Sequence, residues 1–254
     1  DEELSKTRGK IFILDKDTDH SGKIDIDDLE WHYLDGDGDF RSDEVKQLRD
    51  EADIIVTNPP FSLFREFFSW LMAEKKQFLI IGNMNCVTYQ EVFPYIMNND
   101  IWLGNGMGRW ISGFLVPESY ELYGTEARIE DGQRIVATNN CLWLTNLDHG
   151  RRHNPMKLMT MADNIKFSKH KRIREEKYIR YDNYDAIDVP FSDSIPSDYD
   201  GIMGVPISFL DKYNPDQFEI VGEANHGSDN EFDLFKPLIN GKAKFKRILI
   251  RRKK

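Results

Sequence analysis

Hydrophobic residues in the first half of the chain follow two periods, and each predicts one type of secondary structure. Apolar runs at 9–15, 53–57 and 78–83 predict strands, and a further strand region at 24–40 follows a turn. Helical spacing predicts helices at 43–51, 62–77 and 88–99, with Ser62 as the N-cap of the second. Continuously apolar strands such as DIIVT (53–57) are expected to be buried. Their alternation with helices predicts an α/β fold with a parallel sheet covered on both faces.

The pattern changes after residue 100. Short apolar segments such as ISGFLVP (111–117), QRIVAT (133–138) and NCLWLTNL (140–147) are separated by Gly, Asn and Pro, which predicts antiparallel hairpins. Short strands are also expected at 204–209 and 245–250. We therefore expect a first part at 1–148 and a basic C-terminal part at 149–254.

Charge is distributed unevenly along the 254 residues, although the net value is −10. Residues 1–53 hold 18 acidic and 8 basic residues, while residues 149–180 hold 10 basic and 3 acidic ones. The last 13 residues, KAKFKRILIRRKK, add 8 basic residues and no acid. Two basic clusters on a neutral body can bind phosphates, although a solvated charged surface is an equal alternative.

Composition excludes several classes of protein. No run of about 18 apolar residues is present, so no membrane span is expected. The start of the chain lacks the apolar core of a signal peptide, and two cysteines in apolar contexts suit a reducing compartment. We expect a cytoplasmic protein.

The segment DTDHSGKIDIDD (17–28) matches the spacing of a calcium-binding loop. Asp17, Asp19, Ser21, Asp25 and Asp28 occupy ligand positions, and a glycine occupies the turn. The flanking segments are β-branched and aromatic rather than helical, and the last position is Asp instead of the usual Glu. An acidic hairpin turn is therefore favoured, and no metal is assigned.

The strand at 53–57 ends in Asn58, Pro59, Pro60 and Phe61. In an α/β sheet, ligands bind at the carboxyl ends of strands. Because proline donates no hydrogen bond, the carbonyls of Asn58 and Pro59 can point outward beside the Asn58 side chain. Such acceptors suit a conjugated amine with two N–H groups, and Phe61 offers a face for its ring. A proline-rich turn is the alternative.

This tetrapeptide resembles the catalytic motif of S-adenosylmethionine-dependent methyltransferases acting on adenine N6. The resemblance is closest to the EcoRI-type adenine-specific DNA methyltransferases. It rests on DGDFRS (37–42), DIIVTNPPFSLFRE (53–66), FLIIGNMN (78–85), SGFLVPESYELYGTEARI (112–129), NNCLWLTNLD (139–148), YDNYDAI (181–187) and GVPISFLDKYNPDQFEI (204–220).

The resemblance implies a Rossmann-like methyltransferase fold and a role for several residues. Asn58, Pro59, Pro60 and Phe61 would receive a flipped adenine, with Asn58 also near the cofactor. Asp39 and Phe40 would hold the adenine of S-adenosylmethionine, whereas an acidic turn is the alternative for DGDGDF. The partner would be double-stranded DNA, at a site such as GAATTC in a restriction-modification system, and we expect a monomer.

Basic residues are candidates for DNA contact. Arg109 lies in a glycine-rich segment, and a plain surface arginine is an equal alternative for it. Phosphate contacts are expected from the basic C-terminal part: Arg151, Arg152, Lys169, Lys171, Arg172 and Arg174.

The family places its main cofactor motif upstream of DGDF, and the chain starts without one. We therefore expect this chain to lack the front of the enzyme and to bind cofactor poorly by itself. Two other functions remain open: methylation of RNA or protein glutamine, and a non-catalytic DNA-binding or calcium-responsive fragment.

Overall fold

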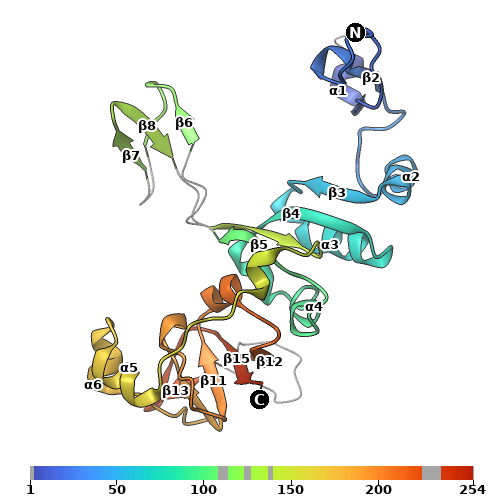
Figure 1. Cartoon of the computed structure of the whole chain (residues 1–254). Helices are drawn as coiled ribbons and strands as arrows, with labels where there is room; N and C mark the ends of the chain where they lie inside the picture. Colours follow the sequence, from blue (N-terminus) through green and yellow to red (C-terminus); the bar gives the residue numbers. More distant parts are fainter. Residues whose placement is uncertain (1–2, 108–113, 123–126, 137–139, 225–235, 254) are drawn as a thin grey trace. The chain divides into compact units, whose positions relative to one another are not determined.

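The computed structural model describes residues 3–107, 114–122, 127–136, 140–224 and 236–253 (Figure 1). They form two compact units, which are described separately. The first unit contains residues 1–55 and 73–76, and the second contains residues 56–72 and 77–254. The structural boundary thus falls near residue 55, and the expected division at 148 lies inside the second unit. As a division of function it stays a prediction.

The first unit is built on a hairpin and a helix. Strands β1 (Lys10–Ile13) and β2 (Glu30–Tyr33) pair antiparallel, with helix α1 (Leu4–Thr7) before them and the 3₁₀ helix η1 (Ile26–Asp28) between them. Helix α2 (Asp43–Glu51) has the predicted bounds, and Ser42 caps it by accepting a hydrogen bond from the Val45 amide. The predicted hairpin and helix are confirmed.

A four-stranded sheet with the order β3-β4-β9-β5 forms the first part of the second unit. Its strands are β3 (Ile54–Thr57), of which only Val56 and Thr57 belong to the second unit, β4 (Gln77–Asn83), β9 (Cys141–Thr145) and β5 (Trp102–Met107). β9 pairs antiparallel with both β4 and β5. Antiparallel pairing was expected for β5 and β9, which come from the region after residue 100, and it is confirmed. The parallel arrangement expected for the strands at 53–57 and 78–83 stays a prediction.

Strand β3 is exposed, although its sequence predicts burial. The exposed fractions of Ile54 and Val56 are 48% and 66%. β3 is the last strand in the sheet order, so it has one neighbouring strand instead of two. An apolar run therefore does not by itself predict which strand lies at the centre of a sheet.

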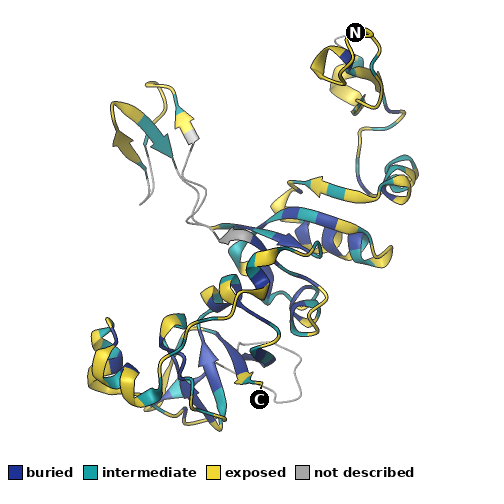
Figure 2. Cartoon of the chain, in the orientation of Figure 1, coloured by how far each residue is buried: buried dark blue, intermediate teal, exposed yellow. Residues whose placement is uncertain are grey.

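Helix α3 (Phe64–Ala73) covers β4 with its apolar face (Figure 2). Phe68 and Phe78 are both fully buried, and their rings meet edge to face at 6.2 Å. The helix begins two residues later than predicted because a 3₁₀ turn, η2 (Phe61–Leu63), precedes it. Ser62 lies inside that turn and caps nothing, so its predicted role is wrong.

Beyond the sheet, short elements dominate, as the sequence predicts. After β4 come η3 (Met84–Thr88) and α4 (Phe93–Met97), in place of one helix at 88–99. Strands β6 (Phe114–Val116), β8 (Gln133–Val136) and β7 (Arg128–Glu130) form an antiparallel sheet in that order.

The C-terminal part has its own four-stranded sheet with the order β10-β11-β15-β12. Its strands are β10 (Ala186–Asp188), β11 (Ile202–Val205), β15 (Arg247–Arg252) and β12 (Phe218–Ala224). All neighbours pair antiparallel except β10 and β11. Helices α5 (Met161–Phe167) and α6 (Lys171–Glu176) precede it.

The molecule is thus a mixed α/β protein with antiparallel C-terminal additions, while the Rossmann-like arrangement stays a prediction. Among the described residues, no helix has the length and apolar character needed to cross a bilayer.

Candidate active site

The segment from Asn58 to Phe61 forms a short, rigid connection between β3 and α3. Pro59 is buried, whereas Asn58, Pro60 and Phe61 are exposed. The Leu63 amide donates a 3.0 Å hydrogen bond to the Pro60 carbonyl, which starts the 3₁₀ turn. The two prolines fix the backbone before this turn, so the loop presents the side chains of Asn58 and Phe61 to solvent.

Two acceptors of this loop remain available. Within the described ranges, neither the Asn58 side chain nor the Pro59 carbonyl takes part in a hydrogen bond. The Pro60 carbonyl, in contrast, is used by the turn. An amide oxygen and a carbonyl oxygen on consecutive residues can accept the two N–H groups of a planar amine.

Close packing at the start of α3 fixes the base of this loop. Phe64 is buried, and its ring lies edge to face with Tyr89 at 6.3 Å. A Cβ atom on Gly82 would lie 2.9 Å from the Phe64 ring and 2.8 Å from Cys86 Sγ, so only glycine allows β4 to approach this closely. Burial raises the pKa of the Cys86 thiol to about 12, which indicates a packing role for this cysteine.

Asp39 and Phe40, the predicted cofactor residues, belong to the first unit. The Arg41 guanidinium donates to both Asp39 carboxylate oxygens at 2.9 and 2.6 Å, and the Arg41 amide donates at 2.8 Å. These bonds lower the pKa of Asp39 to about 2, so the carboxylate is a charged acceptor at neutral pH. Phe40 is buried in this conformation.

Arg41 was missed by the sequence prediction, although it lies two residues after Asp39 in DGDFRS. Arg41 already donates to the Asp39 carboxylate, which would accept the amino group of the cofactor's adenine. A bound adenine would therefore share this carboxylate with Arg41 or displace the Arg41 side chain.

The basic residues of the C-terminal part divide into two groups. Lys169 and Lys171 are exposed and form ion pairs at the surface, with Asp193 at 2.7 Å and with Glu175 at 3.6 Å. Exposed pairs of this kind contribute little to stability and exchange easily for phosphate. Arg109 lies outside the described residues.

The arginines of this part have stronger internal partners. Arg151 pairs with Asp211 at 2.7 Å, and Arg174 donates to the Ser168 carbonyl. Arg172 pairs with both Glu176 and Asp188 at 3.0 Å. These contacts stabilise the fold, so the three arginines have fewer N–H donors available for a phosphate.

Arg152 is a special case, because its side chain is only 8% exposed. Its guanidinium lies 3.4 Å from the centre of the Trp102 ring and donates to Asn99 Oδ1 at 2.5 Å. In this conformation it packs between distant segments, and its predicted contact with a DNA phosphate stays a prediction.

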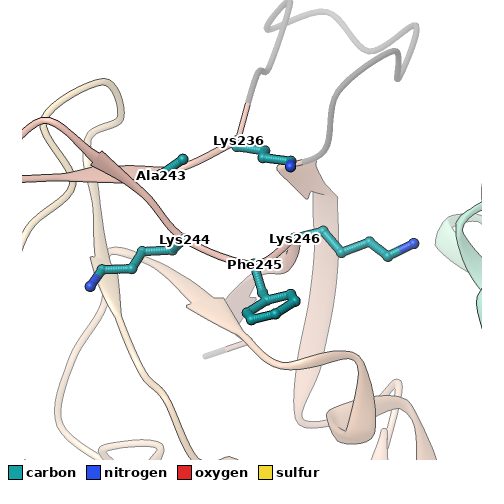
Figure 3. A pocket seen from close by; sticks show the side chains of 5 residues that line it. All are labelled: Lys236, Ala243, Lys244, Phe245 and Lys246. Atoms are coloured by element: carbon teal, nitrogen blue, oxygen red, sulfur yellow. The ribbon is translucent and has the colours of Figure 1, made fainter.

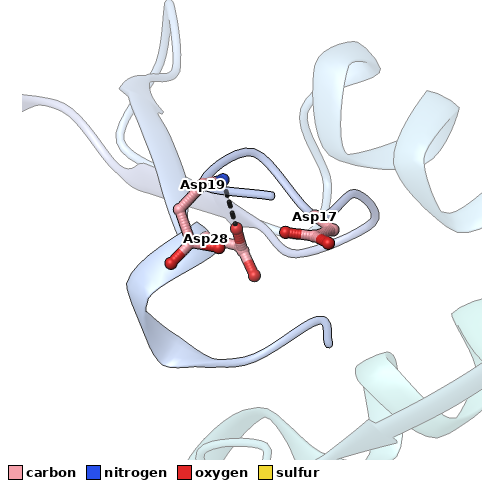
Figure 4. Close-up of side chains that lie close together, drawn as sticks. All are labelled: Asp17, Asp19 and Asp28. Carbon is pink, nitrogen blue, oxygen red and sulfur yellow. Dashed lines mark hydrogen bonds between the residues drawn. The ribbon is translucent and has the colours of Figure 1, made fainter. Parts of the chain in front are cut away.

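The calcium-like loop brings Asp17, Asp19 and Asp28 together, with carboxylate oxygens within 4.8 Å of one another (Figure 4). Hydrogen bonds already satisfy the buried Asp28: it accepts from the Asp25 amide, from the amide and hydroxyl of Thr18, and from the Asp19 amide. These bonds lower its pKa to about 2, the Asp25 amide having the largest effect.

Of the other two predicted ligands, Ser21 donates its amide to Asp17 and Asp19, and Asp25 caps η1. The loop connects two antiparallel strands and is not flanked by long helices. The expected hairpin position of this loop is confirmed, and the choice between an acidic turn and a calcium site stays a prediction.

Comparisons with known proteins agree with the resemblance found in the sequence. The family model described as "Adenine-specific methyltransferase EcoRI" matches residues 1–253. The type II methyltransferase M.EcoRI of Escherichia coli is 50% identical over 244 residues, which are 96% of this chain and 71% of that protein.

Two mycoplasma proteins are more distant relatives. The type II methyltransferases M.MgeORF184P of Mycoplasma genitalium and M.MpnI of Mycoplasma pneumoniae are 40% and 36% identical over 191 residues, 74% of this chain and 57% of each relative. No solved structure matches the chain. The chain therefore belongs to the EcoRI family of adenine-specific methyltransferases, enzymes that place a methyl group on adenine.

Proposed function

We propose that the protein methylates N6 of an adenine flipped out of duplex DNA, at one specific sequence, with S-adenosylmethionine as methyl donor. The observation that carries the proposal is the Asn58–Phe61 loop, which has two unused acceptors and an exposed aromatic ring on a rigid backbone. The relatives' names as type II methyltransferases favour DNA over RNA or protein glutamine as the substrate.

The loop would activate the amine by accepting its hydrogens. Adenine N6 is a weak nucleophile because its lone pair is conjugated with the ring. Hydrogen bonds to the Asn58 side chain and the Pro59 carbonyl would pull the two hydrogens out of the ring plane and free the lone pair, while Phe61 stacks on the base. The positions of both acceptors on one rigid loop would supply the alignment.

S-adenosylmethionine would supply an electrophilic methyl group on a sulfonium. N6 would receive this methyl group in exchange for one proton, which would pass to solvent, and the sulfonium would leave as a neutral thioether; Asn58 and Pro59 would hold the amine in position for this exchange. The charged Asp39 carboxylate fits the amino group of the cofactor's adenine, and Phe40 would pack on its ring once Arg41 is displaced.

Several finer points belong to the same proposal. The recognised sequence would be GAATTC or a relative, and the protein would act as a monomer in the cytoplasm. Phosphates would be bound by Lys169 and Lys171, with help from Arg151, Arg172, Arg174 and Arg109. Mapping of methyladenine in DNA from cells that express the protein would identify the site.

The experiment that tests the chemistry is the Asn58→Ala variant. We expect loss of tritiated methyl transfer to duplex DNA by at least about a hundredfold, with DNA affinity within about threefold of wild type. Ser62→Ala is the matched control, because Ser62 is exposed on the adjoining turn and caps no helix. Full activity of Asn58→Ala, or equal loss in both variants, would remove the mechanism.

Double replacement of Lys169 and Lys171 by glutamine tests the phosphate contacts. The slope of log affinity against log salt should become smaller by about 1.8, since each phosphate contact contributes about 0.9. An unchanged slope would mean that these lysines are only a solvated surface.

A further inference from the structure

Phe245 is the most exposed large apolar side chain among the described residues, at 87%. It lies between Lys244 and Lys246, just before β15, in a groove of about 370 Å³ that Lys236 and Ala243 also line (Figure 3). We call this group of five residues the Phe245 turn. Figure 3 shows the two neighbouring lysines leaving the backbone in opposite directions, with the phenylalanine ring between them.

The groove is strongly positive. Three of its five lining residues are lysines, and none is acidic. Among the described residues, no carboxylate forms an ion pair with these ammonium groups; Lys246 instead donates to Thr88 Oγ1 at 2.6 Å. The sequence from 236 to the end of the chain contains no Asp or Glu. Exposure of the Phe245 ring to water is unfavourable, and the nearby ammonium groups repel one another. A nucleic acid can relieve both costs, because its phosphates are negative and its bases and sugars offer apolar surface.

The backbone of the turn is held in place before any ligand binds. Strands β13 (Leu238–Ile239) and β14 (Lys242–Ala243) form a tight hairpin, and the Lys244 amide donates to the Pro237 carbonyl at 2.8 Å. On the other side, the buried Arg247 guanidinium donates to the Phe245 carbonyl at 3.5 Å and to Asp188 at 3.0 Å. A fixed backbone means that little entropy is lost when the exposed side chains bind.

Two contacts connect the Phe245 turn with the loop that carries Asn58. Lys246 bonds to Thr88, and the next residue, Tyr89, packs against Phe64 at the start of α3. Phe64 follows Phe61 by three residues. All these residues belong to the second unit, so the turn and the loop are parts of one compact body.

We propose that the Phe245 turn is a second DNA-binding element of this enzyme: Lys236 and Lys244 bind backbone phosphates, and Phe245 packs against a base or sugar of the same duplex. This inference rests on the proposed function, because it takes the duplex substrate as the ligand. It adds a contact from a different part of the chain to those proposed for Lys169 and Lys171.

Three variants test the element: Phe245→Ala, the double replacement Lys236→Gln with Lys244→Gln, and the three changes together. The probe is a 30-base-pair duplex containing GAATTC, with a scrambled duplex beside it, and affinity is measured by fluorescence anisotropy at several salt concentrations. Phe12→Ala and Lys16→Gln are matched controls, because both residues are exposed in the first unit.

We expect the two kinds of change to have different signatures. Phe245→Ala should weaken duplex binding about tenfold without changing the salt slope, since an apolar contact with a base step or sugar is not electrostatic. The double lysine variant should reduce the salt slope by about 1.8. Thermal melting should match wild type in all variants, because the replaced side chains lie at the surface. The controls should leave binding and melting unchanged.

The outcomes separate this inference from the proposed function. Normal duplex binding and methylation by all three variants would overturn the inference and leave the function intact. Failure of the wild-type protein to bind any duplex would overturn both. Stronger binding of single-stranded RNA than of duplex, lost with Phe245→Ala, would give the turn a different ligand and overturn the inference as stated.

Discussion

Replacement of Asp188 by asparagine should destabilise the C-terminal part of the protein strongly. The Asp188 side chain is 2% exposed and accepts hydrogen bonds from Tyr181 Oη at 2.7 Å and from Arg172 and Arg247 at 3.0 Å. An amide has no charge to offer these guanidinium groups. Because the Arg247 side chain is only about one tenth exposed, it would be left as a buried, uncompensated charge.

The magnitude follows from the burial of each partner. Loss of one member of a buried ion pair costs about 3–5 kcal/mol. The Arg172 side chain is one third exposed, so water can solvate its charge after the replacement. The lower end of this energy range therefore applies. We expect a loss of about 3 kcal/mol in the free energy of unfolding. With an m value of about 3 kcal/mol/M, the urea midpoint falls by about 1 M.

Circular dichroism during urea unfolding measures this shift, and Asp185→Asn is the control. Asp185 also pairs with an arginine, Arg180, but its side chain is 88% exposed, so a change below about 1 kcal/mol is expected. Arg247→Met, added to Asp188→Asn, should recover part of the loss by removing the orphaned charge. Equal shifts for Asp185→Asn and Asp188→Asn, or no recovery with Arg247→Met, would refute the reasoning.

Two further predictions concern the other titratable groups. A thiol reagent at pH 8 should modify Cys141 but not Cys86 in the folded protein, because Cys86 is buried with its pKa raised to about 12; modification of both thiols before unfolding would contradict this. Asp28 has a folded pKa of about 2 against an ordinary value of 3.8, so its contribution to the stability of the first unit is complete above about pH 4 and is lost as the pH falls towards 2. Asp28→Asn should flatten this part of the pH–stability profile measured by thermal melting, and an unchanged profile would show that other carboxylates determine it.

Local patterns in the sequence predict the elements of this protein well. Helix α2 has the predicted bounds because its cap and its periodicity lie within one short segment. Strand pairing is different: β9 pairs with β4 across more than fifty residues, and no local pattern indicates that it lies between β4 and β5. Ser62 failed as a cap because the helical turn already begins before it: Pro60 is the N-cap of η2, and its carbonyl accepts the Leu63 amide.

In the candidate site, too, features within a few consecutive residues could be predicted from the sequence, whereas contacts between distant residues could not. Asn58 and its prolines can be recognised because their chemistry lies in four consecutive residues. The burial of Arg152 depends on Trp102 and Asn99, about fifty residues away, so a local count of charges cannot detect it. The Phe245 turn was missed for a similar reason, since the basic tail was recognised by charge alone and the exposure of one ring requires the structure.

Two arginines of the C-terminal part, Arg152 and Arg247, differ from its lysines in burial, and this difference can be tested. Both arginines are buried, whereas Lys169 pairs with the exposed Asp193 and Lys244 lines the open groove. The reason is geometric: Arg247 donates to Asp188 from Nε and to the Phe245 carbonyl from Nη1, and the single nitrogen of a lysine cannot occupy both positions. Arg247→Lys should therefore destabilise the protein by about 2 kcal/mol despite the retained charge. Lys169→Arg should leave both stability and DNA affinity near wild type, because a phosphate accepts either cation. If Arg247→Lys were as stable as wild type, charge alone would account for the buried network, and the distinction between the buried arginines and the exposed lysines would fail.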